Sequence, residues 1–199
     1  MMNNKRKILA FFLIICMMLL CAGCAEEAAS MQADETASSA GAPEDTPAAI
    51  SDTPGEKRTA AEGAEMQTAD PEMPTRIMEN GTRIRMHFGD TVIPGILNDS
   101  ETAQALIELL PYTVHMTGYS HDFCGVMPDE LPYEEEDVHW GWLNGDIDYA
   151  VNAPYFTILH SDEEISEQYD FQVNIGVMDC ELARLRDLDG SYDVLIELA

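Results

Sequence analysis

Basic residues are scarce in this chain of 199 residues. It has 10 Lys and Arg against 37 Asp and Glu, which gives a formal net charge of −27 at pH 7. Nucleic-acid binding depends on clustered positive charge that pairs with phosphate groups. The shortage of Lys and Arg therefore excludes nucleic acids as partners.

The chain also lacks a hydrophobic run long enough to span a bilayer. The run Ile8–Leu20 has 13 residues and follows the basic stretch Lys5–Lys7, whereas a membrane-spanning helix needs about 20 residues. A basic start followed by a short apolar run is typical of a signal peptide. We therefore expect residues 1–23 to be removed from the mature protein.

The apolar run ends in the string Cys21-Ala22-Gly23-Cys24. It resembles the lipobox of bacterial lipoproteins, in which small residues before a cysteine permit cleavage and the thiol receives a diacylglyceryl group. The resemblance implies a lipidated Cys24 that holds the protein on the outer face of the cell membrane, with about 0.8 kcal/mol gained for each buried CH₂ group. An ordinary secreted protein cleaved nearby is the alternative.

Aromatic residues are absent from the stretch that follows. Ala25–Thr75 consists mainly of Ala, Glu, Asp, Ser, Thr, Pro and Gly, shows no apolar periodicity, and carries twelve acidic and two basic side chains. This composition is typical of a disordered linker, and its like charges favour an extended chain. We expect residues 24–75 to act as a spacer between the anchor and a folded domain.

The remaining segment, Arg76–Ala199, contains all seven Tyr and both Trp, and its 124 residues suit a single domain. Apolar alternation and turn residues predict strands, whereas the period of Ala103, Leu106 and Leu110 predicts a helix capped by Asn98 or Asp99 and ended by Pro111. The predicted strands cover residues 83–88, 91–96, 112–117, 147–151, 155–160, 172–177 and 192–198, and the predicted helices cover 98–111 and 179–188. Pro94 places the second strand at an edge or a bulge. Many short strands with two short helices indicate a mainly β fold, either a small barrel or a sandwich.

Four segments carry a further resemblance, namely LNDSETAQALIELLP (97–111), LNGDIDY (143–149), APYFTIL (153–159) and NIGV (174–177). In this order they resemble the bacterial cyclophilin-like domain family. The resemblance implies a small closed β-barrel of about eight strands over residues 76–199. It also implies a structural turn at Gly145-Asp146, in which Asp146 accepts backbone N–H groups. The family shares its fold with peptidyl-prolyl isomerases.

Isomerase activity is the first function to consider. Cyclophilins that isomerise proline carry an FHRxI-type strand and an FMxQGGDF segment, and neither string occurs here. The reaction needs a donor such as Arg at the proline nitrogen inside an apolar pocket. Arg83 and Arg85 alternate with apolar residues on the first strand, so we expect both to face solvent.

Metal binding has weak motifs. His121 and Cys124 lie three apart, with His115 and His139 elsewhere in the domain, but no second paired motif completes a zinc site. The acidic runs at residues 134–137 and 162–164 lack the alternating oxygen ligands and central glycine of a calcium loop. We expect solvated loops, no metal and no cofactor.

The two cysteines of the domain leave two alternatives open. Cys124 and Cys180 could form a disulfide outside the membrane, closing a loop that contributes at most about 4 kcal/mol. The other alternative is two separate buried thiols.

Aromatic residues provide the candidate binding surface. Trp140 and Trp142 are two apart, so in a strand they would point the same way, and other aromatic side chains are near in sequence. The candidate surface comprises Trp140, Trp142, Tyr133, Phe123 and Tyr119. Packing in the core or in a lid is the alternative interpretation.

These observations favour a lipid-anchored extracytoplasmic module that binds a peptide, a protein or a small ligand and has no catalytic residues. Two alternatives stay open, namely an extracytoplasmic peptidyl-prolyl isomerase or foldase and a cation-binding surface protein.

Overall fold

The structure, a computed structural model, describes residues 58–169 and 171–199. Nine strands form the framework of this part of the chain, and all their pairings are antiparallel. The strands are β1 (Thr82–Phe88), β2 (Thr91–Leu97), β3 (Tyr112–Gly118), β4 (Asp122–Val126), β5 (Val138–His139), β6 (Asp146–Ala150), β7 (Tyr155–Leu159), β8 (Gln172–Met178) and β9 (Ser191–Leu198).

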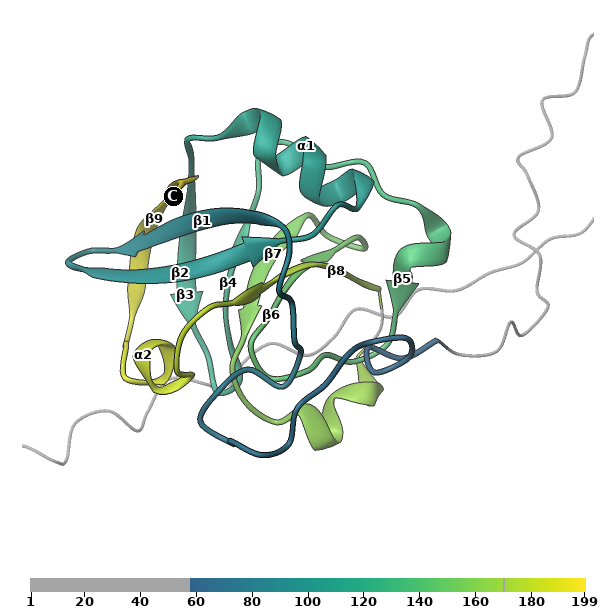
Figure 1. Ribbon diagram of the computed structural model, residues 1–199. Coiled ribbons are helices and arrows are strands. Elements are labelled where there is room, and N and C mark those ends of the chain that lie inside the picture. The colour runs from purple at the N-terminus through teal and green to yellow at the C-terminus, as the bar shows by residue number, and fades with distance from the viewer. Residues whose placement is uncertain (1–57, 170) are drawn as a thin grey trace, which may run out of the picture. The chain divides into compact units, whose positions relative to one another are not determined.

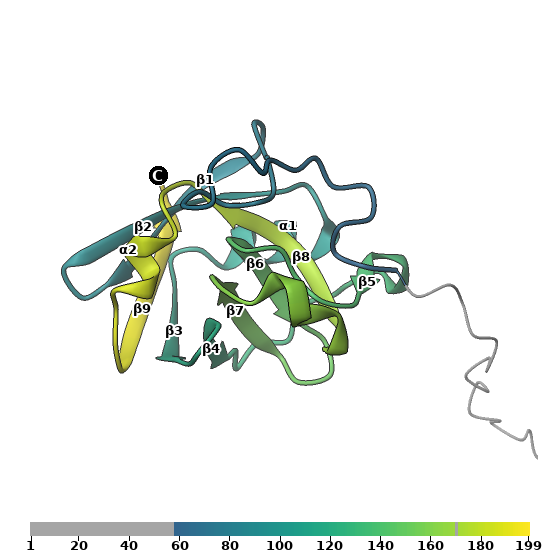
Figure 2. The ribbon, with the colours of Figure 1, turned by 90° about the horizontal axis from the view of Figure 1, so that it is seen from below.

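Eight of these strands close into a barrel. They neighbour one another in the order β2-β1-β9-β3-β4-β7-β6-β8, and pairing of β8 with β2 completes the ring. The short β5 pairs with β8 outside this ring. Figure 1 and Figure 2 show the strands arranged around a common interior. The expectation of a mainly β, closed barrel of about eight strands is confirmed.

The barrel interior is the hydrophobic core. In β1, Ile84, Met86 and Phe88 are fully buried, as the alternation predicts, and apolar side chains of the other strands and of α1 meet them. β2 is an inner strand of the ring and not an edge. The pairing of β2 with β8 begins only at Gly95. Pro94, which has no N–H to donate, therefore lies just before the paired residues.

Two short α-helices occur, as expected: α1 (Glu101–Leu109) and α2 (Ala183–Arg186). The predicted N-cap of α1 is wrong by one or two residues, because the Ser100 side chain accepts the Ala103 N–H. Asn98 instead accepts from the backbone and hydroxyl of Ser100. Two acidic stretches expected as loops form the 3₁₀ helices η1 (Glu135–Asp137) and η2 (Glu163–Gln168).

The folded part includes residues 58–75, which their composition assigned to the linker. Ala60 donates its backbone N–H to Trp140, Thr75 donates to Asn144, and Glu72 accepts from Leu182. These contacts use backbone groups and small side chains, so they leave no apolar period in the sequence. The signal segment 1–23, Cys24 and the linker up to residue 57 lie outside the described residues.

Within residues 58–169 and 171–199, no helix combines the length and apolar character needed to cross a membrane.

Candidate functional site

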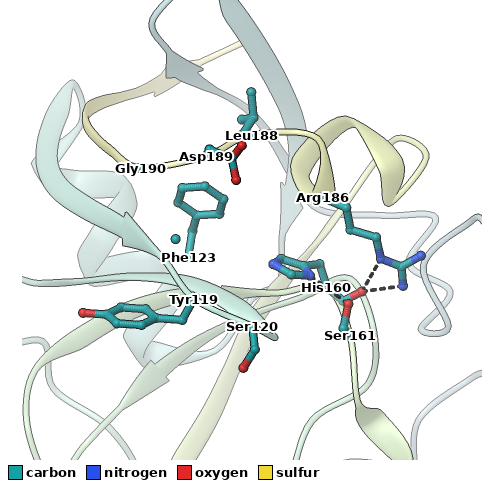
Figure 3. A pocket seen from close by; sticks show the side chains of 10 residues that line it. Tyr119, Ser120, Phe123, His160, Ser161, Arg186, Leu188, Asp189 and Gly190 are labelled. Atoms are coloured by element: carbon teal, nitrogen blue, oxygen red, sulfur yellow. Dashed lines mark hydrogen bonds between the residues drawn. The ribbon is translucent and has the colours of Figure 1, made fainter. Parts of the chain in front are cut away.

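A cavity of about 470 Å³ lies at the end of the barrel opposite α1. Three parts of the chain that are distant in sequence form its wall. These are Gly118, Tyr119 and Ser120 at the β3–β4 turn with Phe123 of β4, His160 and Ser161 after β7, and Arg186, Leu188, Asp189 and Gly190 around the end of α2. Figure 3 shows the side chains that surround the opening.

Phe123 forms the aromatic floor of this cavity, which we call the barrel-end cavity. Its side chain is 1% exposed, and its ring meets Phe88 edge to face at a centroid distance of 5.3 Å. The ring packs directly over Gly118, where an added Cβ would lie 2.7 Å from the Phe123 ring. Glycine at position 118 therefore allows the ring to reach the end of the barrel.

His160 is the histidine of the cavity wall. Burial, followed by the positive charge of Arg186, lowers the pKa of His160 to about 4. Its imidazole is therefore neutral at pH 7 and offers one donor and one acceptor. Nδ1 lies 2.9 Å from the Ser161 hydroxyl.

Arg186 is fixed by the backbone beside it. Nε and Nη2 both donate to the carbonyl oxygen of His160, at 2.9 and 2.5 Å, as the dashed lines in Figure 3 show. Asp189 adds a carboxylate to the cavity lining. The wall therefore combines a guanidinium, a neutral imidazole, a carboxylate and hydroxyl groups over one aromatic ring, which suits a polar ligand held by hydrogen bonds.

The five aromatic residues of the candidate surface do not gather at one place. Phe123 and Tyr119 line the barrel-end cavity, and the Tyr119 ring, 61% exposed, points away from His160. Trp142 is buried, stacks on His121 at 5.0 Å, and donates its indole N–H to the Ser161 carbonyl. Trp142 therefore does not line the cavity itself, but its hydrogen bond holds the backbone of the lining residue Ser161.

Trp140 and Trp142 do not share a strand face. Gly141 lies between them at a φ of +71°, in the left-handed region, and the strand β5 has already ended at His139. Trp140 pairs with Thr59 in an isolated bridge, and Tyr133 is exposed on the segment before η1. The assumption of a continuous strand through Trp140 and Trp142 is wrong, because the backbone turns at Gly141.

The Gly145-Asp146 turn leads into a buried polar cluster. Gly145 has a φ of +98°, and Asp146 accepts the Leu143 N–H at 2.9 Å. Arg76 holds the same carboxylate through two hydrogen bonds of 2.7 and 2.9 Å. Burial raises the pKa of Asp146 to about 6, although Arg76 opposes the increase. The carboxylate therefore stays ionised at pH 7 and ties the segment before β1 to the barrel wall.

Asp148 lies two residues further on and is also fully buried. Asn174 donates to its Oδ1 at 3.0 Å, and burial raises the pKa of Asp148 to about 6. Neither Asp146 nor Asp148 lines the barrel-end cavity. Their position indicates a structural cluster between barrel wall and N-terminal segment, and not a pair of catalytic carboxylates.

Cys124 and Cys180 are separate free thiols in the structure, and both are half-buried, whereas the second alternative expected them to be buried. Burial, with the neighbouring Asp122 carboxylate as the next cause, raises the pKa of Cys124 to about 12. Burial also raises the pKa of Cys180. Both thiols are therefore protonated at pH 7 and are poor nucleophiles.

The candidate metal ligands are dispersed. His115 pairs with Asp193 on the outside of the barrel, His121 stacks on Trp142, and His139 is buried beside the N-terminal segment. No group of three or more His, Cys, Asp or Glu side chains among the described residues is arranged to hold a metal ion.

Arg83 and Arg85 lie on the solvent face of β1, as the alternation predicts. Arg83 forms an exposed ion pair with Asp179. The residues that sequence reasoning missed are His160, Arg186 and Asp189, because the long-range pairing of β3 with β9 brings residues 118–123 and 186–190 together. The turn residues Asp189-Gly190 were the one local signal for that region.

Comparison with known proteins agrees with this architecture. The sequence profile of the cyclophilin-like family matches residues 86–197. The solution structure of the hypothetical protein AF2241 from Archaeoglobus fulgidus is similar, with a TM-score of 0.50 and 18% identity over 62% of this chain and 100% of that chain. At this identity the similarity establishes the fold alone. No curated protein sequence matches the chain.

Proposed function

Since the chain belongs to the cyclophilin-like family, we propose that it is a binding or accessory module anchored to the outer face of the cell membrane through a lipid on Cys24. Its ligand, a peptide, a protein surface or a small molecule, occupies the barrel-end cavity. The module does not catalyse prolyl isomerisation.

The binding role is supported chiefly by the arrangement of Arg186 and His160 in that cavity. Isomerisation needs a guanidinium aimed at the proline nitrogen inside an apolar pocket. Here two of the donor atoms of Arg186 are committed to the His160 carbonyl, and the wall around it is mostly polar. Such a wall favours recognition of a polar group over insertion of a proline ring.

The anchoring role is supported by the sequence before the domain. Lys5–Lys7, the apolar run Ile8–Leu20 and the lipobox-like Cys21–Cys24 follow one another without interruption. The acidic stretch from residue 25 to residue 57 then separates Cys24 from the first described residue, Arg58. A spacer of this kind would hold the domain clear of the lipid headgroups.

An isomerase assay tests the non-catalytic part of the proposal. We expect the full chain, at micromolar concentration, to leave the cis-to-trans isomerisation of an alanyl-prolyl tetrapeptide uncatalysed. Its time constant should stay at about tens of seconds. Catalysis that disappears in the Arg186→Gln variant would assign the cavity to an isomerase instead. Arg184→Gln is the matched control, since Arg184 is exposed on the same helix and does not line the cavity.

Cell fractionation tests the anchor. We expect the native chain in the membrane fraction and the Cys24→Ser variant in the soluble fraction or the medium, because a single thiol is the attachment point for the acyl chains. A Cys180→Ser variant controls for general effects of cysteine loss. Membrane association that survives Cys24→Ser would refute lipid anchoring while leaving the cavity hypothesis untouched.

A further inference from the structure

A second cavity, of about 310 Å³, lies between the N-terminal segment, the start of α1 and β5. It shares no lining residue with the barrel-end cavity. The segment that begins at Arg58 runs beside β5 in Figure 1, and Thr59 bridges to Trp140 there. We call this second opening the lateral cavity.

His139 in the wall of the lateral cavity has unmet hydrogen-bonding capacity. The residue is 5% exposed, and neither ring nitrogen has a hydrogen-bond partner in the described structure. Burial lowers the pKa of His139 to about 4, an effect that the charge of Asp146 only partly opposes. A buried, neutral imidazole without partners is unusual, because buried polar groups are nearly always hydrogen-bonded to protein or water. Both nitrogens are themselves inaccessible to solvent, so the ring forms part of the cavity wall and does not offer them to a ligand.

Positive charge is concentrated here in a domain that has little of it. From residue 58 onward the chain has six Arg and no Lys, and two of the six, Arg58 and Arg76, line the lateral cavity. Arg76 uses Nε and Nη2 for Asp146 and Ala60, which leaves the N–H groups of Nη1 for a ligand. Arg58 contacts the Glu136 carbonyl and lies 3.9 Å from Asp137.

Negative charge lines the same cavity. Glu62, Asp99 and Asp137 contribute carboxylates to the wall. A simple anion would meet these three carboxylates, and a simple cation would meet the two guanidinium groups. A ligand that carries both signs can place each of its charges against the opposite charge of the wall.

We propose that the lateral cavity binds a small zwitterion of amino-acid to dipeptide size. The carboxylate of the ligand lies toward Arg58 and Nη1 of Arg76, and its ammonium group lies toward Asp99 and Glu62. The cavity volume lies at the lower end of the range for small-molecule sites, in keeping with a ligand of this size.

Calorimetry with three matched probes tests this inference on the full chain in mild detergent. The probes are L-alanyl-L-alanine, its N-acetylated form, which keeps only the carboxylate, and its C-terminal amide, which keeps only the ammonium group. We expect the unblocked dipeptide to bind about tenfold or more tightly than either blocked form, because each blocked end loses a charge-assisted contact. Equal affinities for all three, or no heat with any of them at millimolar concentration, would overturn the proposal.

Two exposed wall residues locate the bound probe. We expect Arg58→Gln and Asp99→Asn each to weaken binding of L-alanyl-L-alanine about three- to tenfold. In Arg58→Gln, the amidated probe, which lacks the carboxylate, should lose less affinity relative to L-alanyl-L-alanine than it does with the native chain. In Asp99→Asn, the same should hold for the acetylated probe, which lacks the ammonium group. Arg184→Gln and Asp187→Asn, exposed and outside this cavity, should leave the affinity unchanged. Binding that is insensitive to both wall variants places the probe elsewhere and refutes the inference.

Discussion

At the scale of single residues, burial dominates the ionisation of this domain, and it acts with opposite sign on two kinds of group. Burial lowers the pKa of His139 and of His160 to about 4, and raises the pKa of Asp146 and of Asp148 to about 6. The histidines destabilise the fold as pH falls from 6.5 to 4, because the unfolded chain takes up their protons first. The two aspartates have the opposite effect: as pH falls over the same range, they raise the free energy of unfolding. The reason is that their carboxylates take up protons in the folded chain at a higher pH than in the unfolded chain.

Replacement of His139 by Phe should separate these opposing contributions. The ring keeps its approximate shape and loses two unpartnered nitrogens, so we expect the free energy of unfolding at pH 7 to be unchanged or higher by about 1 kcal/mol. The loss of stability between pH 6.5 and pH 4 should shrink by about 2 to 3 kcal/mol, since a titrating group with a lowered native pKa is gone. Urea denaturation at pH 7, 5.5 and 4 measures both effects.

His139→Asn is the matched control for that variant. It removes the titration but keeps a buried amide, so it should lose the same pH dependence without the gain in stability at pH 7. If His139→Phe instead lowers stability at pH 7 by 2 kcal/mol or more, the imidazole is hydrogen-bonded in solution and is not an unpartnered buried group.

At the scale of elements, the segment from residue 58 to β1 behaves as part of the barrel because one ion pair and several backbone bonds hold it there. Arg76 and Asp146 form a two-point contact with side chains that are 12% and 0% exposed. Arg83 and Asp179 form a similar pair at the surface, with side chains 60% and 42% exposed. The two pairs share their chemistry and differ in burial.

Asp146→Asn should therefore lower the free energy of unfolding much more than Asp179→Asn. Asp146→Asn leaves the Arg76 guanidinium buried without its counter-charge, and we expect a loss of about 3 to 5 kcal/mol in unfolding free energy. Asp179→Asn should cost less than about 1 kcal/mol, because water screens the exposed pair. Hydrogen exchange at the amides of Ala60 and Thr75 should accelerate in the first variant only. Equal costs for the two variants would show that the segment does not depend on the buried pair.

Most elements with a clear pattern could be predicted from the sequence. The β1–β2 hairpin and α1 follow from periodicity and turn residues, whereas β4 (Asp122–Val126) is absent from the predicted strands. β4 has Gly125 at an inward position, where an added Cβ would meet the His115 carbonyl oxygen at 2.2 Å. A strand that needs glycine for close packing shows little apolar alternation. The packing of residues 58–75 was missed for a related reason, since backbone groups make those contacts.

At the scale of the whole molecule, the order of neighbouring strands creates the candidate site, because the pairs β9–β3, β3–β4 and β4–β7 bring its lining segments together. The barrel-end cavity draws on residues from Gly118 to Gly190, and no local pattern reveals that these segments meet. The resemblance to a barrel family was enough to predict the closed sheet, which depends on many strands together. It was not enough to predict the cavity, because the side chains there come from turns, whose positions depend on how the ring closes.

The seam between β2 and β8 is where that closure can be tested. Gly176 lies opposite Leu97, and an added Cβ would meet the backbone carbonyl oxygen of Ile96 at 2.4 Å. Backbone cannot move aside without parting the strands, so we expect Gly176→Ala to cost about 3 kcal/mol in unfolding free energy. It should also weaken the near-ultraviolet circular dichroism of the packed aromatic rings.

Gly95→Ala, on the other strand of the same seam, is the matched control for Gly176→Ala. Its nearest neighbour is the end of the Ile147 side chain at 3.0 Å, which can shift, so a cost of about 1 kcal/mol is expected. Guanidinium denaturation of both variants measures the difference. If Gly176→Ala is as mild as Gly95→Ala, β2 and β8 are not tightly paired in solution. The fold would then be an open sheet in solution and not a closed barrel.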